Sequence, residues 1–282
     1  MIPNPSRVLS LIAVLFLAAC AAKPMEPPPP VPGYEEVQDG EFLIQAVDAK
    51  HLQGTTPRSE VDYAGPEKAG TIVVDTHSRR LYYVLGEGKA MRYAIAVGRE
   101  GLAFHGSGHV GRKEEWPSWT PTANMLRTQG DTYREYAGGL PGGLSNPLGA
   151  RALYLYRGGR DTYFRIHGTI DNASIGRATS AGCIRLFNQD AIDLYNRVKL
   201  GTTVKVRGLE ESLALDGRFM DDARGRAIPY DETMIEKIAE ERAALEAQMA
   251  ADAAAEAAAA DAAAAAEQAA ADAAIASGAV QG

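Results

Sequence analysis

The chain has 282 residues, a formal net charge of −7 and two cysteines. Its charge is uneven, because residues 231–282 hold 11 acidic and two basic residues whereas residues 71–207 hold 19 Lys or Arg against 11 Asp or Glu. The biased ends leave room for one core domain and exclude two large ones. A basic core suits a carboxylate-rich substrate as well as nucleic acid, but no nucleic-acid-binding module is visible.

Residues 1–19 have the features of a secretory signal peptide. Arg7 precedes an apolar run from Val8 to Ala18, which is too short to span a membrane. Leu17-Ala-Ala-Cys20 is similar to a bacterial lipoprotein box, in which Cys20 becomes the lipid-modified first residue; an ordinary signal peptide cut elsewhere is the alternative. The segment predicts an exported protein, lipid-anchored in the periplasm of a Gram-negative bacterium on its inner or outer membrane.

Two segments separate this signal from the core. Residues 20–40 form a Pro-rich linker, since six prolines lie between Pro24 and Pro32 and favour an extended spacer. Residues 41–70 are interpreted as an N-terminal arm packed on the domain, with one short strand within residues 42–47.

The predicted core domain covers residues 71–207. Apolar runs separated by short polar turns predict an antiparallel meander of three strands, at residues 71–75, 81–85 and 90–97. Residues 98–149 are rich in Gly and Pro and aperiodic, which is typical of a functional lid, and they contain Trp116 and Trp119. Further strands are expected at residues 152–156, 162–166, 184–186 and 203–206, with a helix over residues 189–198 capped by Asn188.

Residues 208–230 are interpreted as a linker, followed by an Ala-rich, acidic tail over residues 231–282. Alanine favours helix but buries little apolar area. The tail is therefore predicted to be helical or disordered, either as a solvated extension or as a spacer or self-associating helix.

One stretch, from Ile166 to Asn188, holds a histidine, a cysteine and an arginine around a Gly-rich turn. A nucleophilic thiolate needs a nearby base and amide donors facing the developing oxyanion. His167 ends one predicted strand and Cys183 begins another, so the fold can bring them together. After loss of Cys20 to lipidation, Cys183 is the one remaining thiol, and a lone cysteine in an exported chain favours a catalytic interpretation.

The pattern resembles the L,D-transpeptidase catalytic domain (YkuD type): a His-Gly, about fifteen residues, then Ser-x-Gly-Cys-[Ile/Val]-Arg-x-x-Asn. The resemblance implies a mostly β, β-sandwich-like fold with one or two short helices, here followed by the Ala-rich helical tail. It also implies that Cys183 attacks the carbonyl joining diaminopimelate to the fourth-position D-alanine of a peptidoglycan stem peptide. D-Alanine leaves, an acyl-enzyme forms, and an amine then accepts the acyl group.

The resemblance further assigns the site residues. His167 is the base, and the backbone carbonyl of Gly168 orients its ring. The amides around Gly182 and Cys183 are candidate oxyanion donors, and Ser180 supports the turn. Substrate-binding residues are predicted at Arg185, which can hold a stem-peptide carboxylate through two hydrogen bonds, and at Asn188, Trp116 and Trp119.

Each of these residues has a structural alternative. Cys183 can be a small buried hydrophobe, Arg185 an ion-pair partner, and Asn188 a helix cap rather than a substrate ligand. The two tryptophans either belong to the core or line a lid or groove. Many members of the family have His where this chain has Ala181, which argues against a mechanism with a second histidine.

No metal or cofactor is predicted. His105 and His109 are four residues apart, but Gly106 and Gly108 argue against a helical metal site. The expected function is peptidoglycan L,D-transpeptidation in cell-wall biogenesis and cell shape, either 3-3 cross-linking or attachment of an outer-membrane protein. Transfer to water would make the protein an L,D-carboxypeptidase. A non-catalytic wall-binding lipoprotein is the alternative from another class, and the joint presence of His167, Cys183 and Arg185 argues against it.

Overall fold

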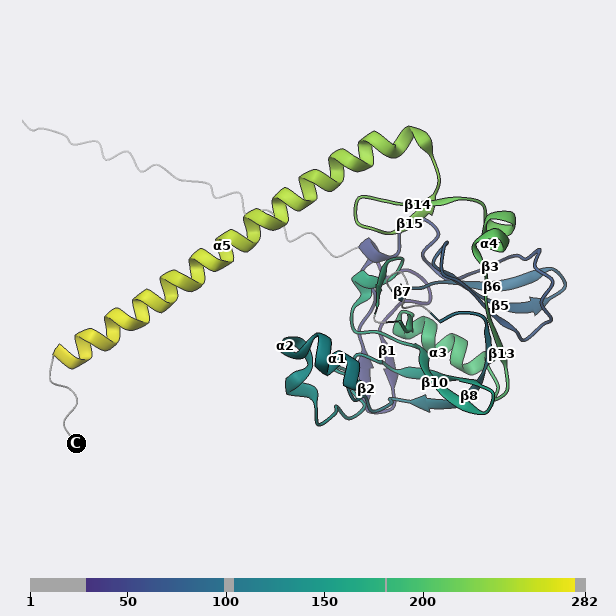
Figure 1. Cartoon of the computed structure of the whole chain (residues 1–282), viewed down its shortest axis with the longest axis horizontal. Helices are drawn as coiled ribbons and strands as arrows, with labels where there is room; N and C mark the ends of the chain where they lie inside the picture. Colours follow the sequence, from purple (N-terminus) through teal and green to yellow (C-terminus); the bar gives the residue numbers. More distant parts are fainter. Residues whose placement is uncertain (1–28, 99–103, 181, 277–282) are drawn as a thin grey trace, which may run out of the picture.

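A nine-stranded sheet forms the body of the protein, in the order β12-β10-β9-β8-β13-β4-β5-β6-β3 (Figure 1). The computed structural model describes residues 29–98, 104–180 and 182–276. The strands of this sheet are β3 (Ser59–Asp62), β4 (Ile72–Asp75), β5 (Arg80–Gly86), β6 (Lys89–Ala94), β8 (Ser107–Glu115), β9 (Arg151–Arg157), β10 (Arg160–His167), β12 (Ile184–Arg185) and β13 (Thr203–Val206).

Three two-stranded sheets and several helices surround this body. The small sheets pair β1 (Val37–Asp39) with β2 (Phe42–Ile44), β7 (Val97–Gly98) with β11 (Ala178–Ser180), and β14 (Phe219–Asp221) with β15 (Ala227–Pro229). The α-helices are α1 (Ala123–Thr128), α2 (Gly130–Tyr133), α3 (Asn188–Arg197), α4 (Leu209–Asp216) and α5 (Ile235–Ala276). Short 3-10 turns are η1 (Ala49–His51), η2 (Arg134–Tyr136), η3 (Asn172–Ser174) and η4 (Glu232–Met234).

The sheet curls so that its two ends meet. Ala96, just beyond β6 near one end, forms a β-bridge with Arg185 of β12 at the other end. Side chains from both halves and from α3 fill the enclosed space, which is the main apolar core. The predicted mostly β fold with a helical tail is thus confirmed.

Local sequence accounts for the meander β4–β5–β6. Ile72 and Val74 face the main core, whereas Val73 faces a second cluster with Tyr82 and Val84 on the other side of the sheet. Because β4 is covered on both faces, its apolar residues run without interruption. The three strands pair antiparallel, as their short turns predict.

The prediction of an uninterrupted lid over residues 98–149 is wrong, because β8 lies within it and pairs with both β9 and β13. Its sequence hid the strand: Val110 is fully buried, but Gly108 and Gly111 flank it. A Cβ at Gly111 would clash with the ring of Tyr156, so glycine here reflects close packing within a sheet. The irregular segment shrinks to residues 116–149, which carry α1, α2 and η2.

Both predicted linkers are also shorter than expected. Residues 20–40 are not all spacer, since Tyr34 is buried and β1 is already part of a hairpin. Residues 41–70 do pack on the domain, and β3 joins the edge of the main sheet beside β6. Residues 208–230 form α4 and the hairpin β14–β15 instead of an open linker.

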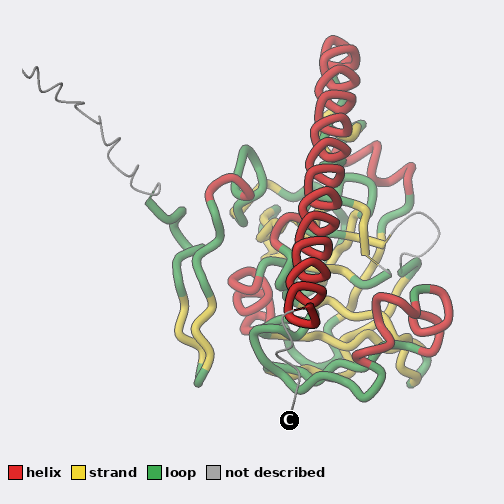
Figure 2. The backbone as a smooth tube through the Cα atoms, turned by 90° about the vertical axis from the view of Figure 1, so that its left-hand side faces the viewer, coloured by secondary structure: helices red, strands yellow, loops and turns green. Residues whose placement is uncertain are grey.

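The tail is one helix of 42 residues that leaves the domain after its first turns (Figure 1). It is by far the longest helical segment, and it passes in front of the strands in Figure 2. Ile238 is buried, but the described residues from Glu246 to Ala273 are exposed. Within the described residues, no helix is both long and apolar enough to cross a membrane.

Candidate active site

The register of β10 and β12 brings the predicted site residues together. The two strands are parallel, with Ile166 opposite Ile184 and His167 opposite Arg185. Because both isoleucines point into the core, alternation places His167, Arg185 and Cys183 on the opposite face. Cys183 comes directly before β12, so the alternation continued by one residue places it diagonal to His167 across this strand pair.

His167 is held in one orientation by its own neighbour. Its Nδ1 lies 2.6 Å from the carbonyl oxygen of Gly168. Since a carbonyl oxygen can only accept, Nδ1 carries the proton and Nε2 is left as the acceptor. Burial lowers the pKa of His167 to about 3, helped by the charge of Arg185, while the Gly168 and Leu148 carbonyls oppose the shift. His167 is therefore a neutral imidazole at physiological pH.

Cys183 is partly exposed and is a free thiol. Burial of the sulfur raises its pKa, whereas the backbone amide of Arg165 and the charges of Arg165 and Arg185 act in the opposite direction. Among the described residues, no hydrogen bond joins its thiol to His167, a gap that is common in a substrate-free site. The resting pair is a thiol beside a neutral base.

The turn before Cys183 is braced by Ser180. The buried Ser180 hydroxyl donates to the Cys183 carbonyl at 2.5 Å and accepts from the Gly182 amide at 3.2 Å. The Gly182 N–H is therefore engaged, in contrast to its predicted role as a free oxyanion donor. Gly182 has φ +129°, a backbone conformation that favours glycine. Ala181 lies outside the described residues.

Asn188 does not cap α3, in contrast to the expectation. Phe187 is the N-cap residue, and the Asn188 side chain instead accepts from the Ala150 amide at 2.9 Å and donates to the Thr169 carbonyl at 3.1 Å. A Cβ on Gly149 or Gly168 would clash with its Oδ1. Asn188 thus clamps the backbone on which the Gly168 carbonyl is presented to His167.

Arg185 has a free guanidinium on the reactive face. Its backbone bonds to Ala96 on both sides, which fixes the strand, and within the described chain its side chain forms no ion pair. Arg165, two residues before His167, was not predicted as part of the site. It is held by both oxygens of Asp161 at 2.7 and 2.8 Å, whereas Arg185 has no carboxylate partner among the described residues.

The two tryptophans anchor other segments. Trp116 donates its indole N–H to Asp39 at 2.8 Å and stacks on Phe42, so it fastens the β1–β2 hairpin rather than lining a groove. Trp119 packs against Tyr133 and Tyr136 of the α2–η2 segment. These contacts give both tryptophans a structural role, and their substrate-binding role stays a prediction.

A buried cluster at the start of α3 was not predicted from the sequence. Asp190 is fully buried and accepts from Arg58 at 2.9 Å and from the Tyr34 hydroxyl at 3.1 Å. Burial raises the pKa of Asp190 to about 7, against these opposing hydrogen bonds. The cluster joins the N-terminal arm to the helix that carries Asn188.

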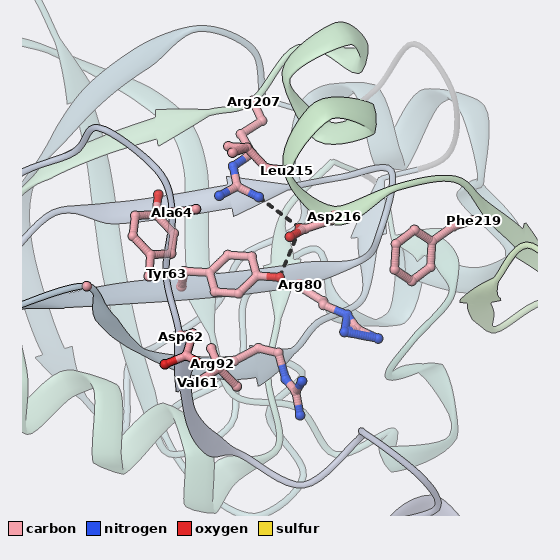
Figure 3. Close-up of a pocket in the computed structure, with 12 residues that line it drawn as sticks. Val61, Asp62, Tyr63, Ala64, Arg80, Arg92, Arg207, Leu215, Asp216 and Phe219 are labelled. Carbon is pink, nitrogen blue, oxygen red and sulfur yellow. Dashed lines mark hydrogen bonds and ion pairs between the residues drawn. The ribbon is translucent and has the colours of Figure 1, made fainter.

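A cavity of about 450 Å³ lies away from these residues, between the sheet and α4 (Figure 3). Its wall includes Tyr82 and the pair Arg207–Asp216, joined at 2.8 Å. Predicted site residues do not line it. The described part of the chain contains no group of three or more His, Cys, Asp or Glu able to hold a metal ion.

An oriented histidine, a diagonal cysteine and a free arginine on one sheet face form the arrangement that covalent acyl transfer requires. The class of domain follows from the comparisons. The family model of the YkuD L,D-transpeptidase catalytic domain matches residues 69–206.

Among curated relatives, the probable L,D-transpeptidase ErfK/SrfK of Escherichia coli is 36% identical over 138 residues, or 48% of this chain and 43% of that protein. A predicted L,D-transpeptidase in the ATP synthase subunits region of Fuscovulum blasticum is 36% identical over 138 residues, or 48% of this chain and 68% of that protein.

A solved Brucella melitensis protein described as a probable carnitine operon oxidoreductase is 45% identical, covering 54% of this chain and 95% of that chain, with a TM-score of 0.39. The match to the family model and to the Fuscovulum relative shows that the chain belongs to the L,D-transpeptidase (YkuD) catalytic-domain family. The chain spans less than half the length of the Escherichia coli relative.

Proposed function

We propose that this protein is a peptidoglycan L,D-transpeptidase that forms an acyl-enzyme on Cys183. The observation that carries the proposal is the register of β10 and β12, which sets Cys183, His167 and Arg185 on one face. Family membership supports the same activity. Arg185 is assigned to a stem-peptide carboxylate, because its guanidinium has no ion-pair partner within the described residues and matches a carboxylate through two hydrogen bonds.

The first step transfers the thiol proton of Cys183 to Nε2 of His167 as the sulfur attacks the carbonyl between diaminopimelate and D-alanine. The C–N bond then breaks, and His167 returns the proton to the departing amine of D-alanine. In the second step an acceptor amine attacks the thioester, the C–S bond breaks, and its proton returns through His167 to the sulfur. The two steps together conserve atoms and charge. One acyl bond is exchanged for another, so the reaction needs no external energy source.

The identity of the acceptor decides the product. A diaminopimelate amine on a second stem gives a 3-3 cross-link, an amine of an outer-membrane protein attaches that protein to the wall, and water gives an L,D-carboxypeptidase. All three share the acyl-enzyme and the roles assigned to Cys183 and His167.

The test incubates the full chain with disaccharide tetrapeptides and follows protein and products by mass spectrometry. We expect D-alanine release with muropeptide dimers; tripeptides without dimers indicate hydrolysis. Cys183→Ala should abolish the acyl-enzyme, and His167→Ala should slow its formation about 10²–10⁴-fold. Arg185→Lys keeps the charge but loses the planar fork, so it should impair muropeptide turnover more than reaction with a small thiol reagent.

Two results contradict the proposal. A carbapenem adduct on the Cys183→Ala protein would place the nucleophile elsewhere, and unchanged muropeptides with folded wild-type protein would favour a non-catalytic wall-binding role. A Ser107→Ala variant is a suitable folded control, because Ser107 is exposed at the start of β8.

We also propose export and lipid anchoring through Cys20, supported by the apolar run and the small residues before it. These residues lie outside the described part of the chain. Mass spectrometry of the mature N-terminus should find lipid on Cys20, and Cys20→Ala should release the protein from membranes. Membrane retention of that variant, with no lipid on the wild type, contradicts the anchor.

A further inference from the structure

A second charged site lies where the first turns of α5 meet the domain. A cleft of about 520 Å³ opens between η1, the loop around η3, the hairpin β14–β15 and α5. Figure 1 shows the hairpin directly beneath the start of α5. The predicted catalytic residues do not line the cleft. Five cationic side chains do, and they are Lys50, Arg177, Arg224, Arg226 and Arg242.

These charges are poorly balanced. Among the described residues that line the cleft, Glu246 is the one acid. Lys50 is paired with Asp48 at 2.8 Å, but across the described chain none of the four arginines forms an ion pair with a carboxylate. The lining cations therefore outnumber the lining acid, and a bound anion would relieve their mutual repulsion.

Buried nitrogens point to the same conclusion. The Nε atoms of Arg177 and Arg226 and the Nδ1 atom of His51 are buried and have no hydrogen-bond partner among the described residues. All three residues line the cleft. Burial lowers the pKa of Arg226, with the charges of Arg177 and Arg224 acting in the same direction and the charge of Asp222 opposing the shift. Buried polar groups in proteins normally have partners, so unpaired donors at a cavity wall mark a place for a ligand acceptor.

The walls of the cleft are fastened to one another. The Ala227 amide of β15 donates to the Gly176 carbonyl, and Gly176 immediately precedes Arg177. Arg79 donates to the carbonyls of both Gly176 and Gly225, at 3.2 and 2.9 Å. On the helix side, Arg242 donates to the Asp222 carbonyl at 3.2 Å. These bonds tie loop, hairpin and α5 together, so the arginines are held before any ligand arrives.

We propose that this cleft binds an oxyanion, a carboxylate or phosphate group, through Arg177 and Arg226 with Arg224 and Arg242 at its mouth. Guanidinium groups match both anions through paired hydrogen bonds. Arg177 lies on the chain segment between His167 and Cys183, so an occupant would touch the segment that leads to the nucleophile. The assignment does not depend on the proposed acyl transfer, because it rests on another set of residues.

The cavity in Figure 3 supplies a matched control. Arg80 and Arg92 line it and also form no ion pair within the described residues. Unlike Arg177 and Arg226, they are hydrogen-bonded through their terminal nitrogens to Thr55 and Ser59, although the Nε of Arg92 is also buried without a partner among the described residues. Two charges can therefore be removed from either place with the same chemical change.

The experiment measures binding of inorganic phosphate and of a disaccharide tetrapeptide to the full chain by isothermal titration calorimetry at low salt. Binding of phosphate alone identifies a phosphate site, and binding of the muropeptide, which offers carboxylates and no phosphate, identifies a carboxylate site. In either case the double variant Arg177→Gln, Arg226→Gln should bind at least about tenfold more weakly, since each lost bond to a charged group is worth about that factor. The control pair Arg80→Gln, Arg92→Gln should bind like the wild type.

Three results overturn the proposal. These are no binding of either probe to the wild type, equal loss in both double variants, and loss confined to the control pair, which would place the anion in the cavity of Figure 3. Circular dichroism establishes whether each variant is folded. Should the double variant unfold, Arg242→Gln on the exposed face of α5 takes its place, with a measurable weakening expected and unchanged affinity overturning the proposal. Acylation of Cys183 by a carbapenem is measured in parallel, so failure here is distinct from failure of the acyl-transfer proposal.

Discussion

The catalytic pair should rest as a neutral thiol and a neutral imidazole rather than as a thiolate–imidazolium ion pair. His167 is buried, and its pKa falls from 6.5 to about 3. That difference corresponds to about 5 kcal/mol against forming the imidazolium in the resting site. Burial also raises the pKa of Cys183. Both changes oppose charge separation, so proton transfer to His167 has to accompany attack on the substrate.

The pH dependence of Cys183 alkylation tests this reasoning. Iodoacetamide reacts with the thiolate, so its rate follows the thiolate fraction. Below the thiol pKa we expect the rate to rise about tenfold per pH unit, with a midpoint above the value of about 8.5 for a free cysteine. Quantifying the Cys183 peptide by mass spectrometry separates it from Cys20. His167→Ala should leave this midpoint nearly unchanged, because a neutral ring contributes no charge.

A thiolate–imidazolium pair predicts a different profile. The wild type would then show a plateau of fast alkylation between about pH 5 and 8, as low-pKa thiols paired with histidine do, and His167→Ala would remove it. That plateau would refute the neutral resting pair. A cysteine-containing peptide measured under the same conditions provides the unperturbed profile.

Three further predictions concern stability. Gly168→Ala should lower the free energy of unfolding by about 1–3 kcal/mol, measured by urea denaturation, because the new methyl group would clash with Asn188; no loss would contradict the clamp. Asp190→Ala should cost about 3–5 kcal/mol in the same assay, since it leaves the half-buried Arg58 without its partner, and a loss below about 1 kcal/mol would make the cluster unimportant. Deleting residues 251–282 should change stability by less than about 0.5 kcal/mol, because the described part of this segment is exposed up to residue 273; a clear fall in melting temperature would show that it packs on the domain.

Local patterns identified most of the sheet from the sequence. Runs such as Ile72–Asp75 combine β-branched residues with short polar turns, and they pair as such runs usually do. The strand β8 was not predicted, because its two glycines and its charged residues are typical of a loop. The reason for those glycines, the close approach of Tyr156, lies 45 residues or more along the chain and belongs to tertiary packing.

The site, too, could be predicted from the sequence only in part. A motif places His167 and Cys183 in sequence, and strand alternation around them predicts a shared face. The role of Asn188 could not be predicted, because a polar residue at the start of a helix is a cap in most proteins and its actual partners, Ala150 and Thr169, are remote in sequence. The predicted helix cap was wrong because the Asn188 side chain bonds the backbone groups of Ala150 and Thr169 instead of the first amides of α3.

The first turn of α3 explains why the chain before the family match belongs to the working domain. This segment, from Tyr34 to residue 68, is called the arm below. Phe187 packs edge-on against Tyr34, Gln189 donates to the carbonyls of Glu35 and Gln45, and Asp190 holds Arg58. Between Phe187 and Gln189 lies Asn188, which clamps the corner that presents the Gly168 carbonyl to His167.

Four consecutive residues therefore join the arm on one side to the catalytic corner on the other. The family match begins at residue 69, so every arm partner of this turn precedes it. Removing the arm would expose the Phe187 ring and leave the Asp190 carboxylate buried without Arg58, which costs several kcal/mol when one partner of a buried pair is lost. The orientation of His167 is thus stabilised in part by residues outside the matched region, through a helix turn whose other face holds the Gly168 backbone in place.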